Sequence, residues 1–216
     1  MNKLVKTRRL THAVALTVLV ATLSGCAPLI LGGAMVGSGL VITDRRTTGI
    51  QVEDQSIEFK AAARVRELAT LGRVDATSYN RIVLLTGEVP AAADRLAVEK
   101  AVAGVENVRS VVNELTVGDK PSLVARSTDA VLAGKVKATF VDTKDVQANA
   151  YKVVAERGVV YLMGRVSERD AQRGTEIARS VSGVQKVVRV FEILTEAELA
   201  TLGTGTAPAS SAPAPR

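Results

Sequence analysis

Very few side chains of this chain are suited to catalysis or metal binding, and two of them stand near its start. Cys26 is the single cysteine and His12 the single histidine among 216 residues. Loss of the segment before Cys26 would leave no histidine, and modification of Cys26 would leave no free thiol. Catalysis by Ser–His or Cys–His pairs, and zinc binding by His and Cys, would then be impossible. Carboxylate, lysine or tyrosine chemistry stays open, but no spacing points to it. We therefore expect no enzyme, no catalytic residue, no bound metal and no cofactor.

The residues around Cys26 suggest what happens to its thiol. Lysines and arginines between residues 3 and 9 precede an apolar stretch at residues 13–23, and small residues follow. This order is typical of a secretory signal peptide. The sequence Leu23-Ser24-Gly25-Cys26 resembles the lipobox of bacterial lipoproteins. The resemblance implies that residues 1–25 are a lipoprotein signal peptide and that Cys26 becomes an N-terminus acylated with chains such as palmitate.

The apolar run continues past the cysteine, so a single transmembrane helix is the alternative. No charged residue occurs from Leu10 to Ile42, and ~20 apolar residues suffice to span a bilayer. Pro28 and several glycines interrupt the second half of this run, which favours the lipid anchor, and several acyl chains give stable anchoring. By resemblance to the enterobacterial sorting rule, Ala27 implies transfer to the periplasmic face of the outer membrane.

The basic residues are concentrated before the cysteine. The formal net charge is +6, and removal of Lys3, Lys6, Arg8 and Arg9 lowers it to +2. A nearly balanced protein with 3% aromatic residues lacks the basic surface and the stacking side chains that nucleic-acid binding requires. We therefore expect no nucleic-acid partner, and no pattern indicates a small-molecule substrate.

The remainder of the chain contains an internal repeat, which decides how it is divided. Residues 83–89 (VLLTGEV) align with residues 160–166 (VYLMGRV). Residues 103–108 (AGVENV) align with residues 182–187 (SGVQKV). The period of about 77 residues is too long for one unit of a solenoid. Two tandem small domains are therefore expected.

Each copy begins with a predicted amphipathic helix. Asp54 and Ser56 are predicted to cap the helix of the first copy, and Ser127 or Thr128 that of the second. The apolar residues of each helix recur on one face, which is expected to enter the core. The predicted core residues are Ile57, Ala61, Val65 and Leu68 in the first copy, and Leu132, Val136 and Phe140 in the second.

Strands and a second helix complete each copy. Short apolar runs predict strands at residues 74–79, 82–89 and 108–115, and again at 151–156, 159–166 and 187–194. Tight turns are expected at Asn80-Arg81 and Arg157-Gly158. The second helices are predicted to start near Pro90 and Ser167. The predicted fold is α+β, with two tandem αββαβ domains, each a small three-stranded mixed sheet with two helices on one face.

Four glycines stand at matching positions of the two copies. Gly87 and Gly164 lie in the predicted central strands. Gly104 and Gly183 follow the second helices, where a C′ glycine commonly ends a helix. We expect all four to have structural roles.

The ordered set of Gly-x-Val, helix and Gly-Val-x-x-Val, present twice behind a lipobox, resembles the BON-domain family of outer-membrane lipoproteins. Residues 44–54, 161–170 and 182–187 carry the resemblance. It implies a first BON domain at residues 49–118 and a second at residues 122–196.

The resemblance further implies a non-enzymatic, lipid-anchored periplasmic protein that supports envelope integrity. Its second domain would bind anionic phospholipid through its first helix, about Ser127 to Val141. The alternative for this helix is an ordinary solvated face, and Val131 stands where a relative carries tryptophan. The alternative function is an adaptor that binds an envelope assembly, a protease or the division machinery. The phospholipid-binding residues carried over by position are Arg126, Val131, Lys135 and Lys137.

The remaining segments are expected to be connections, and the tyrosines to be structural. Residues 26–48 are predicted to be an acylated, Gly-rich tether, and residues 203–216 a disordered tail rich in Pro, Ala and Ser. Tyr79, Tyr151 and Tyr161 are expected at the surface of the sheets rather than as platforms for stacking.

Overall fold

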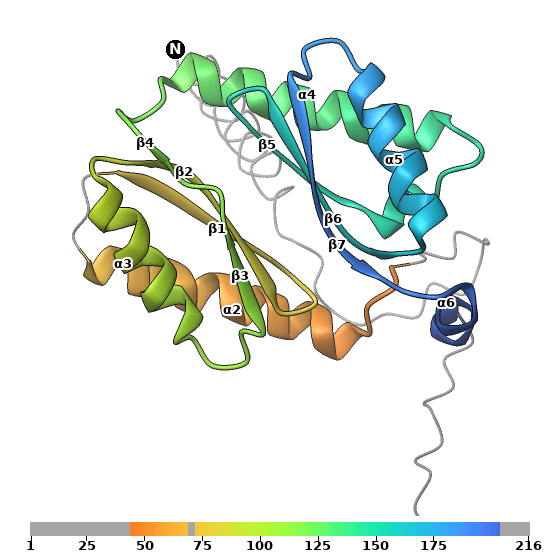
Figure 1. Cartoon of the computed structure of the whole chain (residues 1–216), viewed down its shortest axis with the longest axis horizontal. Helices are drawn as coiled ribbons and strands as arrows, with labels where there is room; N and C mark the ends of the chain where they lie inside the picture. Colours follow the sequence, from red (N-terminus) through yellow and green to blue (C-terminus); the bar gives the residue numbers. More distant parts are fainter. Residues whose placement is uncertain (1–43, 69–71, 204–216) are drawn as a thin grey trace, which may run out of the picture. The chain divides into compact units, whose positions relative to one another are not determined.

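The computed structural model describes residues 44–68 and 72–203 (Figure 1). The predicted signal peptide at residues 1–25, the acylation site Cys26, nearly all of the tether and residues 204–216 lie outside the described residues. The two domains of the repeat are described almost completely.

The first domain has a mixed sheet covered by two helices. Helix α2 (Thr48–Glu67) is followed by β1 (Arg73–Tyr79), β2 (Ile82–Val89), α3 (Ala92–Ala103), β3 (Ser110–Asn113) and β4 (Thr116–Val117). Strand β2 is central, antiparallel to β1 and parallel to both β3 and β4. The predicted last strand is thus split into two pieces. Asn113 accounts for the break, because its side-chain oxygen accepts a hydrogen bond from the Leu115 amide at 3.1 Å.

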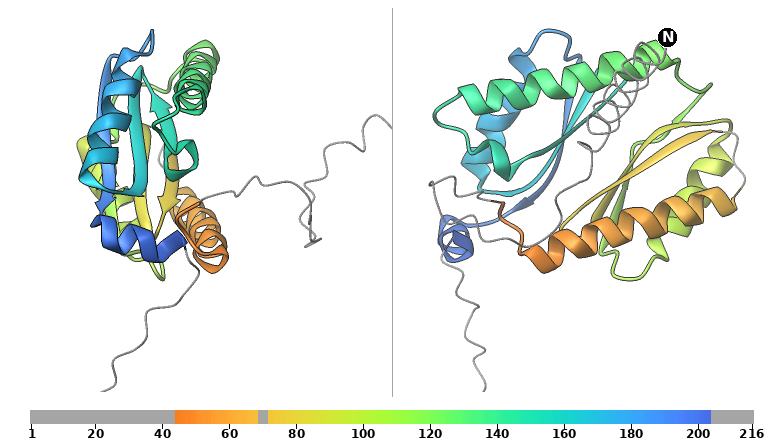
Figure 2. Two further views of the ribbon diagram at one scale, coloured as in Figure 1. Left: turned by 90° about the vertical axis from the view of Figure 1, so that its right-hand side faces the viewer. Right: turned by 180° about the vertical axis from the view of Figure 1, so that it is seen from behind.

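The second domain repeats this order without the break. Helix α4 (Leu123–Asp142) and the short 3-10 helix η2 (Ala148–Ala150) precede β5 (Lys152–Glu156), β6 (Val159–Val166), α5 (Glu168–Ser180) and β7 (Lys186–Ile193). Strand β6 lies between antiparallel β5 and parallel β7. In both domains the first helix lies alongside the first strand, α2 with β1 and α4 with β5 (Figure 2). The predicted tandem α+β fold is confirmed. A further helix, α6 (Glu196–Gly203), follows β7 and was not predicted.

The two predicted tight turns join the antiparallel strands of each domain. Asn80 and Arg81 have φ values of 50° and 66°, and Arg157 and Gly158 have φ values of 53° and 74°. Two successive residues with positive φ form the turn that matches the twist of a two-residue hairpin. Both turns therefore set the register of their strand pairs, as predicted.

The predicted helix starts are wrong for both first helices. Each helix begins about one to two turns earlier, with Thr47 and Ser122 as the N-cap residues. The Thr47 hydroxyl accepts a hydrogen bond from Ile50 N at 3.3 Å, and the Ser122 hydroxyl accepts one from Ala125 N at 3.1 Å. Asp54 instead lies inside α2 and is buried.

The starts of the second helices are closer to prediction. Pro90 stands just before the N-cap residue of α3, Ala91, rather than in its first turn. Ser167 is the N-cap of α5, as predicted, and its hydroxyl accepts a hydrogen bond from Asp170 N at 3.2 Å.

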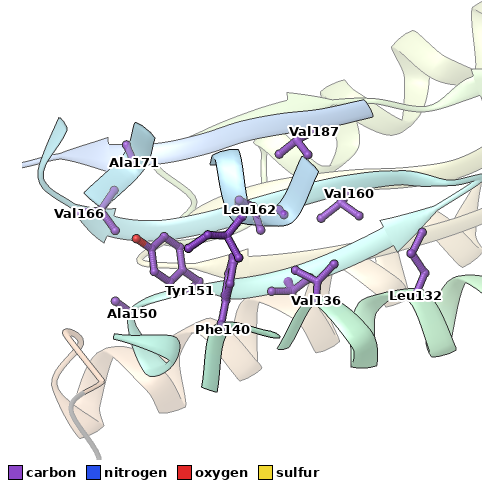
Figure 3. Packing of buried hydrophobic residues seen from close by; sticks show 13 residues of the cluster. Leu132, Val136, Phe140, Ala150, Tyr151, Val160, Leu162, Val166, Ala171 and Val187 are labelled. Atoms are coloured by element: carbon purple, nitrogen blue, oxygen red, sulfur yellow. The ribbon is translucent and has the colours of Figure 1, made fainter. Parts of the chain in front are cut away.

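Each domain has its own apolar core between the sheet and its helices. In the second domain, Leu132, Val136 and Phe140 point from α4 into the core, where Phe140 packs against Tyr151 (Figure 3). Ile57, Ala61 and Val65 occupy the equivalent places in the first domain. These predicted core residues are confirmed, except that Leu68 ends its helix and is 40% exposed.

A third apolar cluster joins the opposite faces of the two sheets. It contains Tyr79 and Leu84 of the first domain with Tyr161, Met163 and Val190 of the second. The tyrosines are therefore buried, and the prediction that they lie at the sheet surface is wrong. Tyr151 is buried too, in the core of its own domain. The sheet face that looks exposed in one repeat is covered by the other repeat.

Candidate functional site

The outward surface of α4 carries a stripe of apolar and small residues that is interrupted by the exposed Ser127. Residues 123, 130, 134 and 141 form one stripe because they are spaced by seven, four and seven positions. All four are exposed, and the two ends of the stripe are large side chains: Leu123 is 72% exposed and Val141 is 71% exposed. Val124 and Val131 add exposed apolar area on one side.

The charges around this stripe are basic. Lys135 and Lys137 are exposed and lie on opposite sides of the stripe. Asp129 is the one acidic residue of α4 before its last residue, Asp142, and it is buried. The exposed surface of α4 therefore presents apolar side chains flanked by lysines, without an acid until its C-terminal end.

Among the predicted lipid-binding residues, the structure separates Arg126 from Val131 and Lys135. Arg126 is half-buried, and its Nε atom is buried without a hydrogen-bond partner. It lines a groove against the first domain, next to Arg73 and Val74. Val131 and Lys135 instead line a second cavity. The predicted set thus divides between two flanks of the helix.

Two buried aspartates hold the tight turns, and sequence reasoning missed both. Asp129 accepts hydrogen bonds from Arg157 N at 2.9 Å and from Gly158 N at 3.0 Å. Asp54 accepts equivalent bonds from Asn80 N and Arg81 N, both at 2.8 Å. The two aspartates are 75 residues apart at matching positions of the repeat, and this match was the sequence signal that could have pointed to their shared role. Each aspartate fixes the turn that its domain's register depends on.

Asp54 also binds the segment that precedes its helix. Arg46 Nη1 donates to Asp54 at 2.8 Å, and Arg46 Nη2 donates to Asp44 at 2.8 Å. The guanidinium lies 4.1 Å above the centre of the Tyr79 ring. Burial by itself would raise the pKa of Asp54, but hydrogen bonds from Ser78, Arg81, Arg46 and Asn80 outweigh it and hold that pKa below the ordinary 3.8. Burial also raises the pKa of Tyr79 to about 12.

The neighbouring arginine binds the other domain. Arg45 donates to the Arg165 carbonyl oxygen at 2.8 Å, to Gln147 Oε1 at 2.9 Å and to Asp170 Oδ2 at 3.0 Å. Residues 44–46, at the end of the predicted tether, are therefore fastened to the second domain by Arg45 and to the first by Arg46. These residues belong to the motif that carried the family resemblance, but the contacts of Arg45 span more than a hundred positions and could not be predicted.

Polar contacts reinforce the junction between the domains. Lys152 donates to Glu58 at 2.7 Å, and Arg73 donates to Glu156 at 3.2 Å. Glu192 of the second domain forms an ion pair with Arg109 of the first at 3.4 Å. The junction is held by both apolar and ionic contacts.

The four predicted structural glycines differ in how strictly glycine is required. Gly87 has φ +114°, and a Cβ there would lie 2.1 Å from the Arg73 carbonyl oxygen. A Cβ on Gly164 would lie 2.4 Å from the Ala150 carbonyl oxygen. Gly183 has φ +101°, whereas Gly104 has φ −82° and a Cβ there would come no closer than 3.6 Å to another atom. Gly104 therefore does not adopt the left-handed C′ conformation that we predicted.

Neither membrane-spanning helices nor metal sites are found in the described part of the chain. Within residues 44–68 and 72–203, no helix is both long and apolar enough to cross a bilayer. The same ranges contain no cluster of three or more His, Cys, Asp or Glu side chains that could hold a metal ion.

Comparison with known proteins identifies the fold. The family model described as "BON domain" matches residues 53–119 and residues 128–195. Outer membrane lipoprotein DolP of Haemophilus influenzae is 42% identical over 176 residues, which cover 80% of this chain and 90% of that protein. A 21 kDa hemolysin of Actinobacillus pleuropneumoniae is 33% identical, covering 68% of this chain and 78% of that protein. Osmotically-inducible protein Y of Escherichia coli is 29% identical, covering 63% of this chain and 70% of that protein.

The fold and these likenesses together define the class of protein. Two αββαβ units with Gly-containing central strands form a tandem α+β repeat protein. The chain belongs to the BON-domain family, and within it the chain is a DolP-like lipoprotein. The likeness to an outer membrane lipoprotein supports association with the outer membrane.

Proposed function

We propose that the second BON domain binds the surface of an anionic phospholipid membrane through α4. The surface of α4 carries this proposal, because exposed apolar side chains flanked by lysines without a nearby acid are typical of helices that lie in a bilayer interface. Leu123, Val131 and Val141 would enter the headgroup region, and Lys135 and Lys137 would extend to lipid phosphates on either side. Each lysine would contribute ~1 kcal/mol near an anionic surface.

Acylation of Cys26 would hold this domain at the periplasmic face of the outer membrane. The likeness to DolP and the lipobox support this part of the proposal. The intact mass of the protein extracted from membranes tests it, because cleavage before Cys26 and acylation change the mass by defined amounts. An uncleaved, unacylated chain would contradict it. A supporting role in envelope integrity, without enzyme activity, follows from the same family likeness.

The lipid contact is tested on the membrane-extracted protein in nanodiscs of phosphatidylcholine, with or without phosphatidylglycerol. Spin-labelled lipid should broaden the backbone amide signals of α4 residues 130–138 strongly in the anionic discs and weakly in the neutral ones. The double variant Lys135→Glu, Lys137→Glu should lose this difference. The control Lys100→Glu makes one such lysine-to-glutamate change on the exposed surface of α3 and should keep the difference between the discs. Equal broadening in both discs would exclude anionic recognition by α4.

A further inference from the structure

A cavity of about 560 Å³ lies between α4, the β5–β6 turn and the loop before β7. Its apolar lining includes Val131 and Leu132, and its charged lining includes Lys135 and Arg157. Both cations are exposed: the Arg157 side chain is 56% exposed. The volume lies in the range of ligand pockets.

Two buried carboxylates also line this cavity. Glu88 reaches it from β2 of the first domain and is fully buried. Its Oε2 atom has no hydrogen-bond partner, and its Oε1 atom accepts only a 3.5 Å bond from Arg157. Asp129 is 7% exposed, accepts the two turn amides, and forms no ion pair within the described residues. A carboxylate offers about four acceptor positions. Both groups therefore have unused acceptor capacity where burial makes an unpaired charge costly.

The first domain fills the equivalent acceptor with its own arginine. Asp54, which matches Asp129, accepts four donors, including the Arg46 guanidinium. That arginine comes from the segment just before α2. The corresponding position before α4 is Pro121, which also lines the cavity and carries no charge.

The mouth of the cavity differs between the domains as well. In the first domain Lys60 of α2 donates to Glu106 in the loop before β3 at 2.8 Å. The repeat aligns Lys60 with Lys135 and Glu106 with Gln185. A lysine and a glutamine form no ion pair, so the second domain lacks this bridge. Lys135 and Gln185 both line the open cavity instead.

We propose that this cavity binds an arginine side chain on an extended segment of a partner protein. The guanidinium would donate to Glu88 and Asp129, as Arg46 donates to Asp54, and its methylene groups would lie against Val131 and Leu132. Five N–H donors in a planar fork suit two carboxylates better than an ammonium does. An acidic residue of the partner, two positions before its arginine as Asp44 is before Arg46, would pair with Lys135. The site needs no lipid and lies beyond the proposed function.

The test uses the full chain in detergent micelles and the peptide acetyl-Asp-Ala-Arg-Thr-amide. The backbone amide signals of Arg157 and Gly158 should shift saturably as the peptide is added. The matched peptide with citrulline in place of arginine keeps the shape and loses the charge, and its binding should be at least tenfold weaker. Equal shifts from both peptides, or no saturable shift from either, would overturn the proposal.

Three variants locate the site without disturbing the cores. Glu88→Gln should weaken peptide binding at least tenfold, because it removes a buried charge and keeps the side-chain shape. Gln185→Glu changes an exposed residue and should weaken it by bridging to Lys135, as Glu106 bridges to Lys60. Glu106→Gln, in the first domain, should leave binding unchanged. If Glu88→Gln and Gln185→Glu both bind like the unaltered chain, the peptide does not occupy this cavity and the proposal fails.

An amine-bearing lipid headgroup is the competing occupant. Nanodiscs of phosphatidylethanolamine differ from those of phosphatidylcholine in the methyl groups on nitrogen. If phosphatidylethanolamine alone moves the Arg157 and Gly158 signals while the arginine peptide does not, the cavity is a lipid headgroup site and the arginine proposal is overturned. Lys135 belongs to both surfaces, so the single variant Lys137→Glu, whose residue does not line the cavity, reports on the membrane surface alone and keeps the two outcomes separate.

Discussion

The two BON domains share a fold but use the same buried aspartate differently. Asp54 of the first domain is saturated by two turn amides, a serine hydroxyl and Arg46. Asp129 of the second domain holds only its turn. In the first domain this aspartate therefore holds residues 44–46 in place. In the second domain the aspartate keeps unused hydrogen-bond acceptor positions, and it lies beside a cavity and the exposed apolar side chains of α4. At this pair of matching positions, the second repeat leaves open an acceptor that the first repeat fills.

A second pair of matching positions differs in the same direction. Tyr79 ends β1 and stacks under Arg46, whereas Glu156 ends β5 and pairs with Arg73. Burial raises the pKa of Glu156, and nearby Glu88 and Asp129 raise it further against the effect of Arg73. At this position the first repeat has an aromatic ring stacked against a cation, whereas the second has a carboxylate close to two other carboxylates.

Removal of the two aspartates should give the largest difference between the domains. Asp54→Ala removes one of the two carboxylates that bind the Arg46 guanidinium, as well as the acceptor of two turn amides, and loss of one partner of a buried pair costs about 3–5 kcal/mol. Asp129→Ala strands two turn amides and no cation, so its cost should be about 2 kcal/mol. Urea unfolding followed by circular dichroism measures both. An equal cost for the two variants would contradict the assigned role of Arg46.

Substitution of the two matching helix-terminal glycines by alanine should change the free energy of unfolding by less than removal of the aspartates. Gly183→Ala forces a side chain into φ +101°, at a cost of about 1–2 kcal/mol. Gly104→Ala has an ordinary φ and no Cβ contact below 3.6 Å, so it should be neutral or stabilise by up to about 1 kcal/mol. The same unfolding measurement separates them. A destabilised Gly104→Ala variant would show that the two loops are more alike than their backbones indicate.

The pH dependence of stability should have opposite signs for Glu156 and Asp54. The pKa of folded Glu156 lies above its ordinary 4.5, so its stabilising contribution is present below pH 4.5 and is lost as the pH rises through the folded pKa. The pKa of Asp54 lies below 3.8, so its contribution is present above pH 3.8 and is lost as the pH falls through the folded pKa.

Two variants measure these contributions in unfolding experiments across pH 2–7, a window of about five units around both pKa values. Glu156→Gln should gain stability relative to the unaltered chain as the pH rises above 4.5. Asp54→Asn should be less stable than the unaltered chain at neutral pH, and this difference in the free energy of unfolding should become smaller as the pH falls below 3.8. A constant difference across the window for either variant would contradict the assigned pKa shift.

The smallest expected effect concerns the bridge that closes the first domain. Lys60→Ala removes an ion pair between exposed side chains, so the unfolding midpoint should stay within experimental error. The pKa of Glu106 is lowered by its hydrogen bond from Lys60 and should return toward 4.5, as measured by NMR titration of the carboxyl carbon. An unchanged Glu106 titration would mean that the bridge is not populated in solution.

The sequence was sufficient for the features that depend on local pattern. Strands 82–89 and 159–166 were predicted with their observed bounds, because short apolar runs and tight-turn signals are local. The helix starts were missed because several Ser, Thr and Asp residues stand near each start and all are good caps. Asp54 looked like a cap and is instead the buried acceptor for a turn 26 residues away.

The site was predictable only in outline. Val131 and Lys135 were named from family position, and they line one cavity. Helical spacing already places Arg126 on a different side of the helix from Val131 and Lys135, but it does not reveal that this side packs against the first domain. Glu88 could not be predicted as a site residue either, because it belongs to a strand of the first domain and reaches the cavity of the second only through the packing of the two domains.

The apolar cluster between the two sheets has a consequence for experimental design. A fragment containing one BON domain would expose Tyr79 and Leu84, or Tyr161, Met163 and Val190, to water. Such a fragment would tend to self-associate, and its loss of activity would report a damaged surface rather than the absence of its neighbour. Point substitutions are therefore the way to find out which domain performs which function. Truncation would assign to one domain a property that depends on both.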